Sequence, residues 1–536
     1  MANLGRATAL LASGTLVSRV LGFGRQWLLL FALGGTGLVT DAFQTANSAP
    51  NAVYAIISQG ILNAVLIPQI VRAAKHPDGG QGYINKLVTL GLVVFAGITA
   101  IATLLSPQLM WLLGVHNSKV VDLAVVFAYW SMPQVFFYGL YSLLGEVLNA
   151  RNSFGPFTWA PVLNNIIAIA ALGLFLVLYG QQPVKTVGDW PPDKIFILAG
   201  GSTLGIAAQA IVLFAFWRRV GLRFRLDFSW RGMDLRTVGR AAGWTFAMLV
   251  CTQLAGNYQT FVANTASGAH RAGPAGIATT WLIFMLPFSI IAVSVVTAYF
   301  TRMAEHARDE NFESFRTDYS TAVRQIVLLI SVCASVLIVT AFSFSRVFTS
   351  DYIPYGFVLI AFVLGLVPSV IGFVSLRALY SLGDTRSPFV YTLVQAILVA
   401  IGLSICLALP LGIRAVGIAL TVTIAGTVQA ALSVIFLRRR LHGLHLHSVF
   451  GAVWHGFIAA VVAAVLGSFA LFGADHLGGH AGFSTATAVS AVISMIIVGI
   501  VMVAAYVLVL RALRTPELLD AWTAVRRRLG RSQPAE

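Results

Sequence analysis

Apolar residues form runs of about 20 along almost the whole chain, and short polar connections separate them. A helical run of this length crosses the hydrocarbon core of a bilayer. No stretch shows the two-residue alternation of a membrane β-strand, and backbone groups in lipid must bond locally, so each run is predicted to be a helix. We place about fourteen spans at residues 7–33, 42–71, 87–113, 121–148, 157–180, 194–217, 241–266, 273–301, 322–345, 354–381, 389–409, 414–437, 449–473 and 484–510.

Composition agrees with this pattern and excludes the common soluble classes. Apolar residues make up 58% of the 536 positions, charged residues make up 10%, and the mean hydropathy is +0.84. A soluble domain is about half apolar and about a quarter charged. The net charge of +16 would suggest a nucleic-acid partner in a soluble protein, but here the basic residues lie between apolar blocks. The predicted fold class is an all-α polytopic membrane protein without a nucleic-acid partner.

Basic residues are distributed unequally between the two sets of alternating connections. Most of the 35 Lys and Arg residues lie in one set, which includes residues 218–240, or in the C-terminal tail. Cytoplasmic loops carry such an excess. Both termini are therefore predicted to be cytoplasmic, which requires an even number of spans.

Several local features recur in the same order in the two halves of the chain. They are Pro156-Phe157 with Pro388-Phe389, Pro133 with Pro368, and Pro50 with Pro287. Two halves that each have six spans must share one topology, as in transporters built from parallel repeats. The sequence predicts two pseudo-symmetric six-helix lobes around a central cavity. Chance matching of prolines and basic helix ends is the alternative.

This repeat defines the expected domains. They are an N-lobe with spans 1–6 (residues 1–220), a C-lobe with spans 7–12 (221–440), two extra spans (441–512) and a basic cytoplasmic tail (513–536). Rocking of two such lobes would expose a central site to each side of the membrane in turn, which predicts an alternating-access transporter.

Two arginines interrupt the first apolar run, at Arg19 and Arg25. An arginine near the bilayer centre costs about 3 kcal/mol, so such residues usually face a wet cavity. The two are six positions apart in the sequence, which places them about 120° apart on a helix, within reach of one cavity. Their planar guanidinium groups suit phosphate or carboxylate and predict an anionic substrate. The alternative is that they reach the interface or pair with Asp41 and Glu146.

Four residues are candidates for a gate or hinge. Gly22 and Gly24 flank this region of the first span and would let its helix bend, while Pro50 and Pro287 interrupt later spans. Close helix packing is the alternative role of the glycines.

The residues around these arginines resemble a known family. Ser18-Arg-Val-Leu-Gly-Phe-Gly-Arg25, followed by Thr40-Asp-Ala-Phe43 and Pro50-Asn51, is similar to the opening of the MurJ (MviN) lipid II flippases of the MOP exporter superfamily. Ala160-Pro161 with Asn165, and residues 380–388, also match. The form Gly22-Phe-Gly-Arg-Gln26 is similar to the actinobacterial branch.

The resemblance implies movement of undecaprenyl-pyrophosphate-linked muropeptide, called lipid II, from the inner to the outer leaflet of the bacterial cytoplasmic membrane. This step serves peptidoglycan synthesis, the cell wall and cell shape. It further implies a cationic central cavity for the pyrophosphate and an apolar groove near the last two spans for the polyprenyl tail. Membrane lipids and cell-wall synthases are the other expected partners.

Family positions carry over residue by residue as candidate substrate-binding residues. Arg19 and Arg25 match the cavity arginines of the first helix, and Asp41 matches an acidic residue at the outer end of the second. Ser18 and Asn51 match polar positions, and Gln59 stands where the family has an acidic residue. The candidate set is Arg19, Arg25, Asp41, Ser18, Asn51 and Gln59.

The chain also departs from the family pattern. Tyr54 stands where many members have a second-span arginine, and Leu282 replaces an eighth-span arginine. A three-arginine clamp is therefore not assumed. With fewer cations the pyrophosphate would rely on Gln59, Asn51 and helix dipoles, or the cargo would differ within the same chemical class.

Motifs for covalent chemistry, ATP hydrolysis or metal binding are missing from the sequence, so no enzyme activity, catalytic residue, cofactor or metal site is predicted. Energy would come from the membrane potential or a monovalent cation. The polar seventh span has no carboxylate for an ion site, and Asp384 is expected to cap a helix. The alternatives to a lipid II flippase are another MOP-type exporter, either a polysaccharide-lipid flippase or an ion-coupled antiporter, and a non-transporting cell-wall scaffold.

Overall fold

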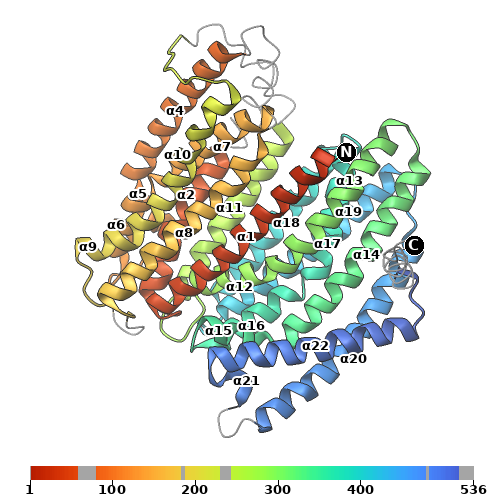
Figure 1. The fold of residues 1–536 in the computed structure, drawn as a ribbon. Coiled ribbons are helices and arrows are strands. Elements are labelled where there is room, and N and C mark those ends of the chain that lie inside the picture. The colour runs from red at the N-terminus through yellow and green to blue at the C-terminus, as the bar shows by residue number, and fades with distance from the viewer. Residues whose placement is uncertain are drawn as a thin grey trace, which may run out of the picture. The chain divides into compact units, whose positions relative to one another are not determined.

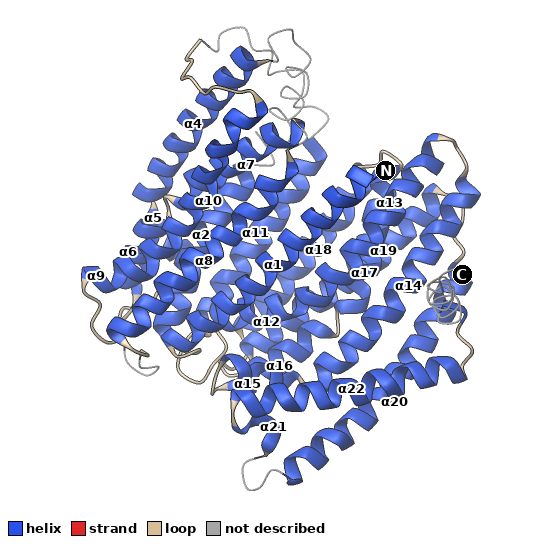
Figure 2. Cartoon of the chain, in the orientation of Figure 1, coloured by secondary structure: helices blue, strands red, loops and turns tan. Residues whose placement is uncertain are grey.

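Every element of the computed structural model is a helix within the residues it describes, which are 2–57, 80–151, 153–182, 187–229, 243–477 and 482–517 (Figures 1 and 2). The chain divides into two compact units. The first contains Met1–Gly276 with Cys406–Arg414, and the second contains Ile277–Ile405 with Ala415–Glu536. The predicted helical membrane protein is therefore confirmed as a fold class.

The first unit holds the N-terminal helices. They are α1 (Ala2–Leu33), α2 (Leu38–Ile57), α4 (Gln81–Leu104), α5 (Ser106–Leu112), α6 (Val121–Ser131), α7 (Gln134–Ala150), α8 (Phe154–Tyr179), α9 (Pro192–Ile195), a π-helix (Phe196–Gly200), α10 (Gly201–Trp217), a 3-10 turn (Arg218–Val220) and α11 (Gly243–Thr265). The seventh predicted span, α11, lies in this unit and packs against α2.

The second unit holds most of the remaining helices. They are α12 (Pro274–Pro287), whose first residues belong to the first unit, a π-helix (Phe288–Ala292), α13 (Val293–Arg308), α14 (Phe312–Val339), α15 (Ala341–Phe348), α16 (Tyr352–Val363), α17 (Leu366–Ser381), α18 (Arg386–Leu407), α19 (Arg414–Arg440), α20 (Leu446–Leu477), α21 (Phe483–Ala486) and α22 (Ala488–Ala512). Within this unit α20 packs against α14 and α22 (Figure 1).

Each predicted apolar run overlaps one helix or up to three consecutive helical elements, but the count of fourteen spans is not confirmed. Among the described residues, 11 helices are long and apolar enough to cross a membrane, or up to 12 if the bent pair α16 and α17 forms one span. Helices α2 and α11 are outside this set. Both are rich in polar residues that bond to each other, such as Thr45 and Asn264, and this lowers their hydropathy.

Two predicted spans are interrupted where the regular backbone hydrogen bonds of the helix are broken. Pro133 has no N–H and separates α6 from α7. Helices α16 and α17 are bent by 42° at Leu364–Gly365. These breaks lie in the two spans that carry the aligned prolines Pro133 and Pro368.

Close packing in the first unit depends on small residues at helix crossings. A Cβ atom at Gly14 of α1 would lie 2.8 Å from Nε1 of Trp159 on α8, so the two helices approach closely there. Glycine allows such an approach because it has no side chain. This contact places the first helix, and therefore its two arginines, against α8.

Candidate functional site

Arg19 and Arg25 lie in the middle of α1, where the sequence predicts a substrate contact. The Arg19 side chain is exposed and that of Arg25 is half-buried. Neither forms an ion pair or hydrogen bond with another described residue, which includes Asp41 and Glu146. Arg25 is close enough to Tyr138 of α7 to interact with it electrostatically. Carboxylate pairing, the alternative considered for both arginines, is therefore not observed in the described part of the chain.

Asn165 of α8 holds the backbone of α1 one residue before Arg19. Its buried side-chain amide donates to the Ser18 carbonyl oxygen at 2.9 Å and to the Ser18 hydroxyl at 3.3 Å. Gly22 lies one turn further along α1, where an added Cβ would be 3.8 Å from the same amide nitrogen. Ser18 and Gly22 therefore face α8, and this contact sets the rotation of α1 that aims its arginines.

Tyr138, which interacts electrostatically with Arg25, belongs to a group of stacked aromatic rings. The rings of Tyr54 on α2 and Tyr138 on α7 are stacked with centroids 5.6 Å apart. One turn along α7, the Tyr141 hydroxyl donates to the Phe157 carbonyl oxygen at 2.9 Å, and its ring stacks on that of Phe157. Tyr54 therefore packs against Tyr138 in a group of aromatic side chains. Sequence reasoning did not identify Tyr138, although the Tyr-rich start of α7 was a visible signal.

Asp41 is buried on α2, and one of its two carboxylate oxygens binds the backbone of α12. Its Oδ1 accepts the Ala275 backbone N–H at 3.0 Å, at the first turn of α12. The aspartate therefore satisfies a helix N-terminus, where unpaired N–H groups attract an anion. A Cβ atom at Gly273 would lie 2.1 Å from Oδ2 of Asp41, so this position has space only for glycine.

The polar residues of α11 bond helix to helix. Asn264 donates to the Thr45 hydroxyl at 3.0 Å and to the Leu113 carbonyl oxygen at 2.8 Å, and Gln253 donates to the Ala52 carbonyl oxygen at 3.2 Å. These contacts favour the helix-packing interpretation of the polar seventh span over an ion site.

The structure gives less information on the other predicted site residues. Asn51 is exposed on α2, and Gln59 falls outside the described residues. Among the hinge candidates, Gly24 has no atom within 4 Å of its Cβ position, Pro50 lies inside α2, and Pro287 ends α12 just before a π-helix. Helix α1 is continuous from Ala2 to Leu33 past both hinge candidates, Gly22 and Gly24.

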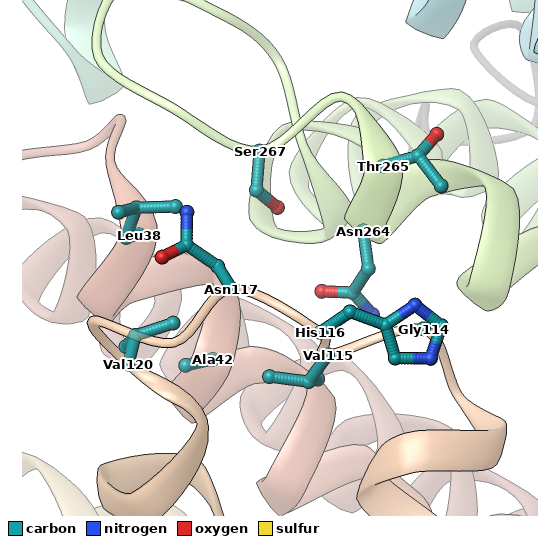
Figure 3. A pocket seen from close by; sticks show the side chains of 10 residues that line it. All are labelled: Leu38, Ala42, Gly114, Val115, His116, Asn117, Val120, Asn264, Thr265 and Ser267. Atoms are coloured by element: carbon teal, nitrogen blue, oxygen red, sulfur yellow. The ribbon is translucent and has the colours of Figure 1, made fainter.

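A polar recess of about 350 Å³ opens at one end of the first unit (Figure 3). It lies between the start of α2, residues 114–120 and the end of α11. Its lining residues are Leu38, Ala42, Gly114, Val115, His116, Asn117, Val120, Asn264, Thr265 and Ser267. The lining does not include either arginine, so the recess is separate from the site on α1.

The second unit contains an apolar groove of about 310 Å³ between α14, the bend of α16 and α17, and α20. Its walls include Ile338, Leu364 and Phe457, and Ala460 and Ala464 leave room beside them. In a bilayer such a groove suits a hydrocarbon chain.

Asp384 caps helix α18, as the sequence predicts. Its Oδ1 accepts the backbone N–H groups of Arg386 and Ser387 at 3.0 and 2.9 Å, and its Oδ2 accepts the Ser387 hydroxyl at 2.6 Å. This arrangement is the N-cap pattern and occupies the carboxylate. The capping role of Asp384 is therefore confirmed.

Comparison with known proteins adds independent information. The model of a family described as "Lipid II flippase MurJ" matches residues 31–477, a segment that begins after Arg19 and Arg25. A "Probable lipid II flippase MurJ" of Rhizobium tropici is 27% identical over 479 residues, which cover 86% of this chain and 84% of that protein. A protein of the same name from Rickettsia prowazekii (strain Madrid E) is 25% identical and covers 83% of this chain and 86% of its own.

Solved structures show the same fold at low sequence identity. "Lipid II flippase MurJ, inward closed conformation" has a TM-score of 0.70 at 18% identity and covers 94% of this chain and 99% of its own. An inward-facing multidrug resistance MATE family transporter of the MOP superfamily has a TM-score of 0.62 at 17% identity. The match covers 81% of this chain and 98% of that transporter.

Proposed function

The chain belongs to the MurJ family of lipid II flippases, and on this premise we propose that it moves lipid II across the bacterial cytoplasmic membrane. The direction of transport is from the inner to the outer leaflet. The protein is a transporter and not an enzyme, since its family does no covalent chemistry on the cargo.

One observation of the structure carries the assignment of the substrate site. Arg25 is half-buried on α1 and has no carboxylate partner among the described residues. An opposite charge stabilises a partly buried cation, so an anion from outside the chain is favoured at this guanidinium group. The pyrophosphate of lipid II supplies two adjacent phosphates that match the fork of an arginine. Arg19, exposed on a neighbouring side of α1, adds the second positive charge.

The remaining candidates take supporting roles in this proposal. Ser18 is a backbone anchor for α1, Asp41 holds the start of α12, and Asn51 and Gln59 remain polar candidates on the second span. The polyprenyl tail would occupy the apolar groove lined by Phe457, Ala460 and Ala464. This proposal is supported by the groove's apolar walls and its place beside α20, the thirteenth predicted span.

Orientation and energy coupling follow from charge and topology. The excess of basic residues in alternate connections supports cytoplasmic termini. Transport by alternating access suits two repeats of like topology. We infer coupling to the membrane potential or a monovalent cation, because the sequence has no motif for ATP hydrolysis. Cell-wall synthases are proposed partners that would receive the delivered cargo.

Depletion of the protein combined with an assay of leaflet location tests this function. We expect lipid II to accumulate in the inner leaflet as the protein is lost, while its synthesis continues. Normal amounts in the outer leaflet with misplaced synthases would contradict transport and favour a scaffold. Ion-gradient-dependent efflux of small molecules by the purified protein, without lipid II movement, would favour an antiporter.

A further inference from the structure

The hydroxyl group of Tyr138 makes no hydrogen bond with another described residue. The residue lies half-buried on α7, within electrostatic range of Arg25. Tyr141, one turn further on, shows the contrast, because its hydroxyl donates to the Phe157 carbonyl oxygen at 2.9 Å. Partly buried phenol groups normally find a partner. The Tyr138 hydroxyl is therefore available to a ligand that approaches Arg25.

The ring of Tyr138 is held in place by its neighbour on another helix. Tyr54 of α2 stacks on it at 5.6 Å between centroids with an interplanar angle of 29°. The stack fixes the Tyr138 ring against α2, and so it sets the position of a neutral hydroxyl donor.

From this arrangement we infer that Tyr138 is a further binding residue for the pyrophosphate, and that Tyr54 is its positioning residue. The Tyr138 hydroxyl donates a hydrogen bond to a phosphate oxygen that Arg25 holds. This inference rests on the proposed function, because it assigns a contact within the same site. The ligand class is a polyprenyl pyrophosphate, and the hydroxyl recognises its charged head rather than its tail.

Binding to the full-length protein in phosphatidylcholine nanodiscs tests the inference with two probes. Undecaprenyl pyrophosphate carries the head and the tail, and undecaprenol carries the tail alone. We expect Tyr138→Phe to weaken binding of undecaprenyl pyrophosphate about tenfold, the usual effect of losing one hydrogen bond to a charged group. Binding of undecaprenol should not change. Equal affinity of the variant and the unmodified protein for the pyrophosphate would overturn the inference.

Tyr141→Phe is the matched control on the same helix. It removes a hydroxyl that bonds to the backbone, so it should lower the melting temperature and leave pyrophosphate affinity unchanged. If Tyr138→Phe also lowers the melting temperature, the binding of undecaprenol distinguishes the two causes. Misfolding would weaken the binding of both probes, whereas loss of the hydroxyl would weaken only the binding of undecaprenyl pyrophosphate. Equal weakening of both probes would count against the inference. Tyr54→Phe should preserve the affinity for undecaprenyl pyrophosphate, and Tyr54→Leu should reduce it. Binding of undecaprenol should be unchanged in both variants.

The same preparations separate this inference from the proposed function. A protein that binds the pyrophosphate through Tyr138 but does not translocate lipid II would support the inference and contradict the function. A protein that translocates lipid II while Tyr138→Phe binds normally would support the function and contradict the inference.

Discussion

The side-chain amide of Asn165 donates a 2.9 Å hydrogen bond to the backbone carbonyl of Ser18, and so joins α8 to α1 beside Arg19. The bond reaches the backbone of α1 rather than one of its side chains. An amide that bonds to the backbone fixes both the height and the rotation of α1. The direction of the two arginines therefore depends on a residue of another span.

Replacement of Asn165 by Leu should lower both stability and transport. The variant loses its bonds to Ser18, which costs about 1 kcal/mol, and α1 can then rotate away from its position. Thermal unfolding in detergent and lipid II movement in proteoliposomes measure the two effects. Ser18→Ala is the control, because it keeps the carbonyl contact and should change each value less. Equal loss in the two variants would show that the hydroxyl, and not the backbone contact, is important.

Asp41→Ala should destabilise the protein by about 1–3 kcal/mol, because it leaves the Ala275 N–H buried without an acceptor. Asp41→Asn keeps an acceptor and should cost less. Gly273→Ala offers a second route to the same defect, since its Cβ would lie 2.1 Å from the Asp41 carboxylate. Chemical or thermal unfolding provides the comparison. A Gly273→Ala protein as stable as the unmodified one would contradict the described packing around Asp41.

The glycines of α1 should differ in their tolerance of a side chain. Gly14→Leu should be destabilising by about 1–3 kcal/mol, because it forces atoms into Trp159. Gly24→Ala has open space and should keep or raise stability, since alanine favours a helix by about 1 kcal/mol. Reduced transport at unchanged stability in Gly24→Ala would support its role as a hinge. Normal transport would contradict that role.

Filling the apolar groove should reduce lipid II movement without unfolding the protein. Ala464→Phe places a ring in the space proposed for the polyprenyl tail, whereas Val465→Phe adds a ring at the next residue, which is 50% exposed and does not line the groove. Both variants place a phenylalanine on the same helix, one inside the groove and one outside it. Translocation assays should show a loss for Ala464→Phe only. An equal effect of both would argue against tail binding in this groove.

Local sequence patterns predicted the helices well because apolar length and proline act within a few residues. Pro133 marks the break between α6 and α7, and Asp384 caps α18 as its place before Pro388 predicts. The π-helix at Phe196–Gly200 has no such local signal. The number of spans was not settled because α2 and α11 carry polar residues whose partners lie on other helices.

The candidate site was predicted only in part, because its contacts join residues that are distant in sequence. Arg19 and Arg25 were visible as charges within an apolar run. In contrast, 234 positions separate Asp41 from Ala275, and 147 separate Asn165 from Ser18. Nor does any local pattern place Tyr54 on Tyr138. The sequence therefore identifies the charged residues of one helix, but only the folded structure shows which residues of other helices orient them.

Translocation of lipid II by the purified Arg25→Ala variant in proteoliposomes tests the central claim most directly. The claim is that a half-buried guanidinium group, which has no ion-pair partner among the described residues, holds the pyrophosphate during transport. We expect Arg25→Ala to lose transport while it stays folded, and Arg25→Lys to keep a small part, because lysine retains the charge but not the planar fork. Transport by Arg25→Ala at the rate of the unmodified protein would contradict the account.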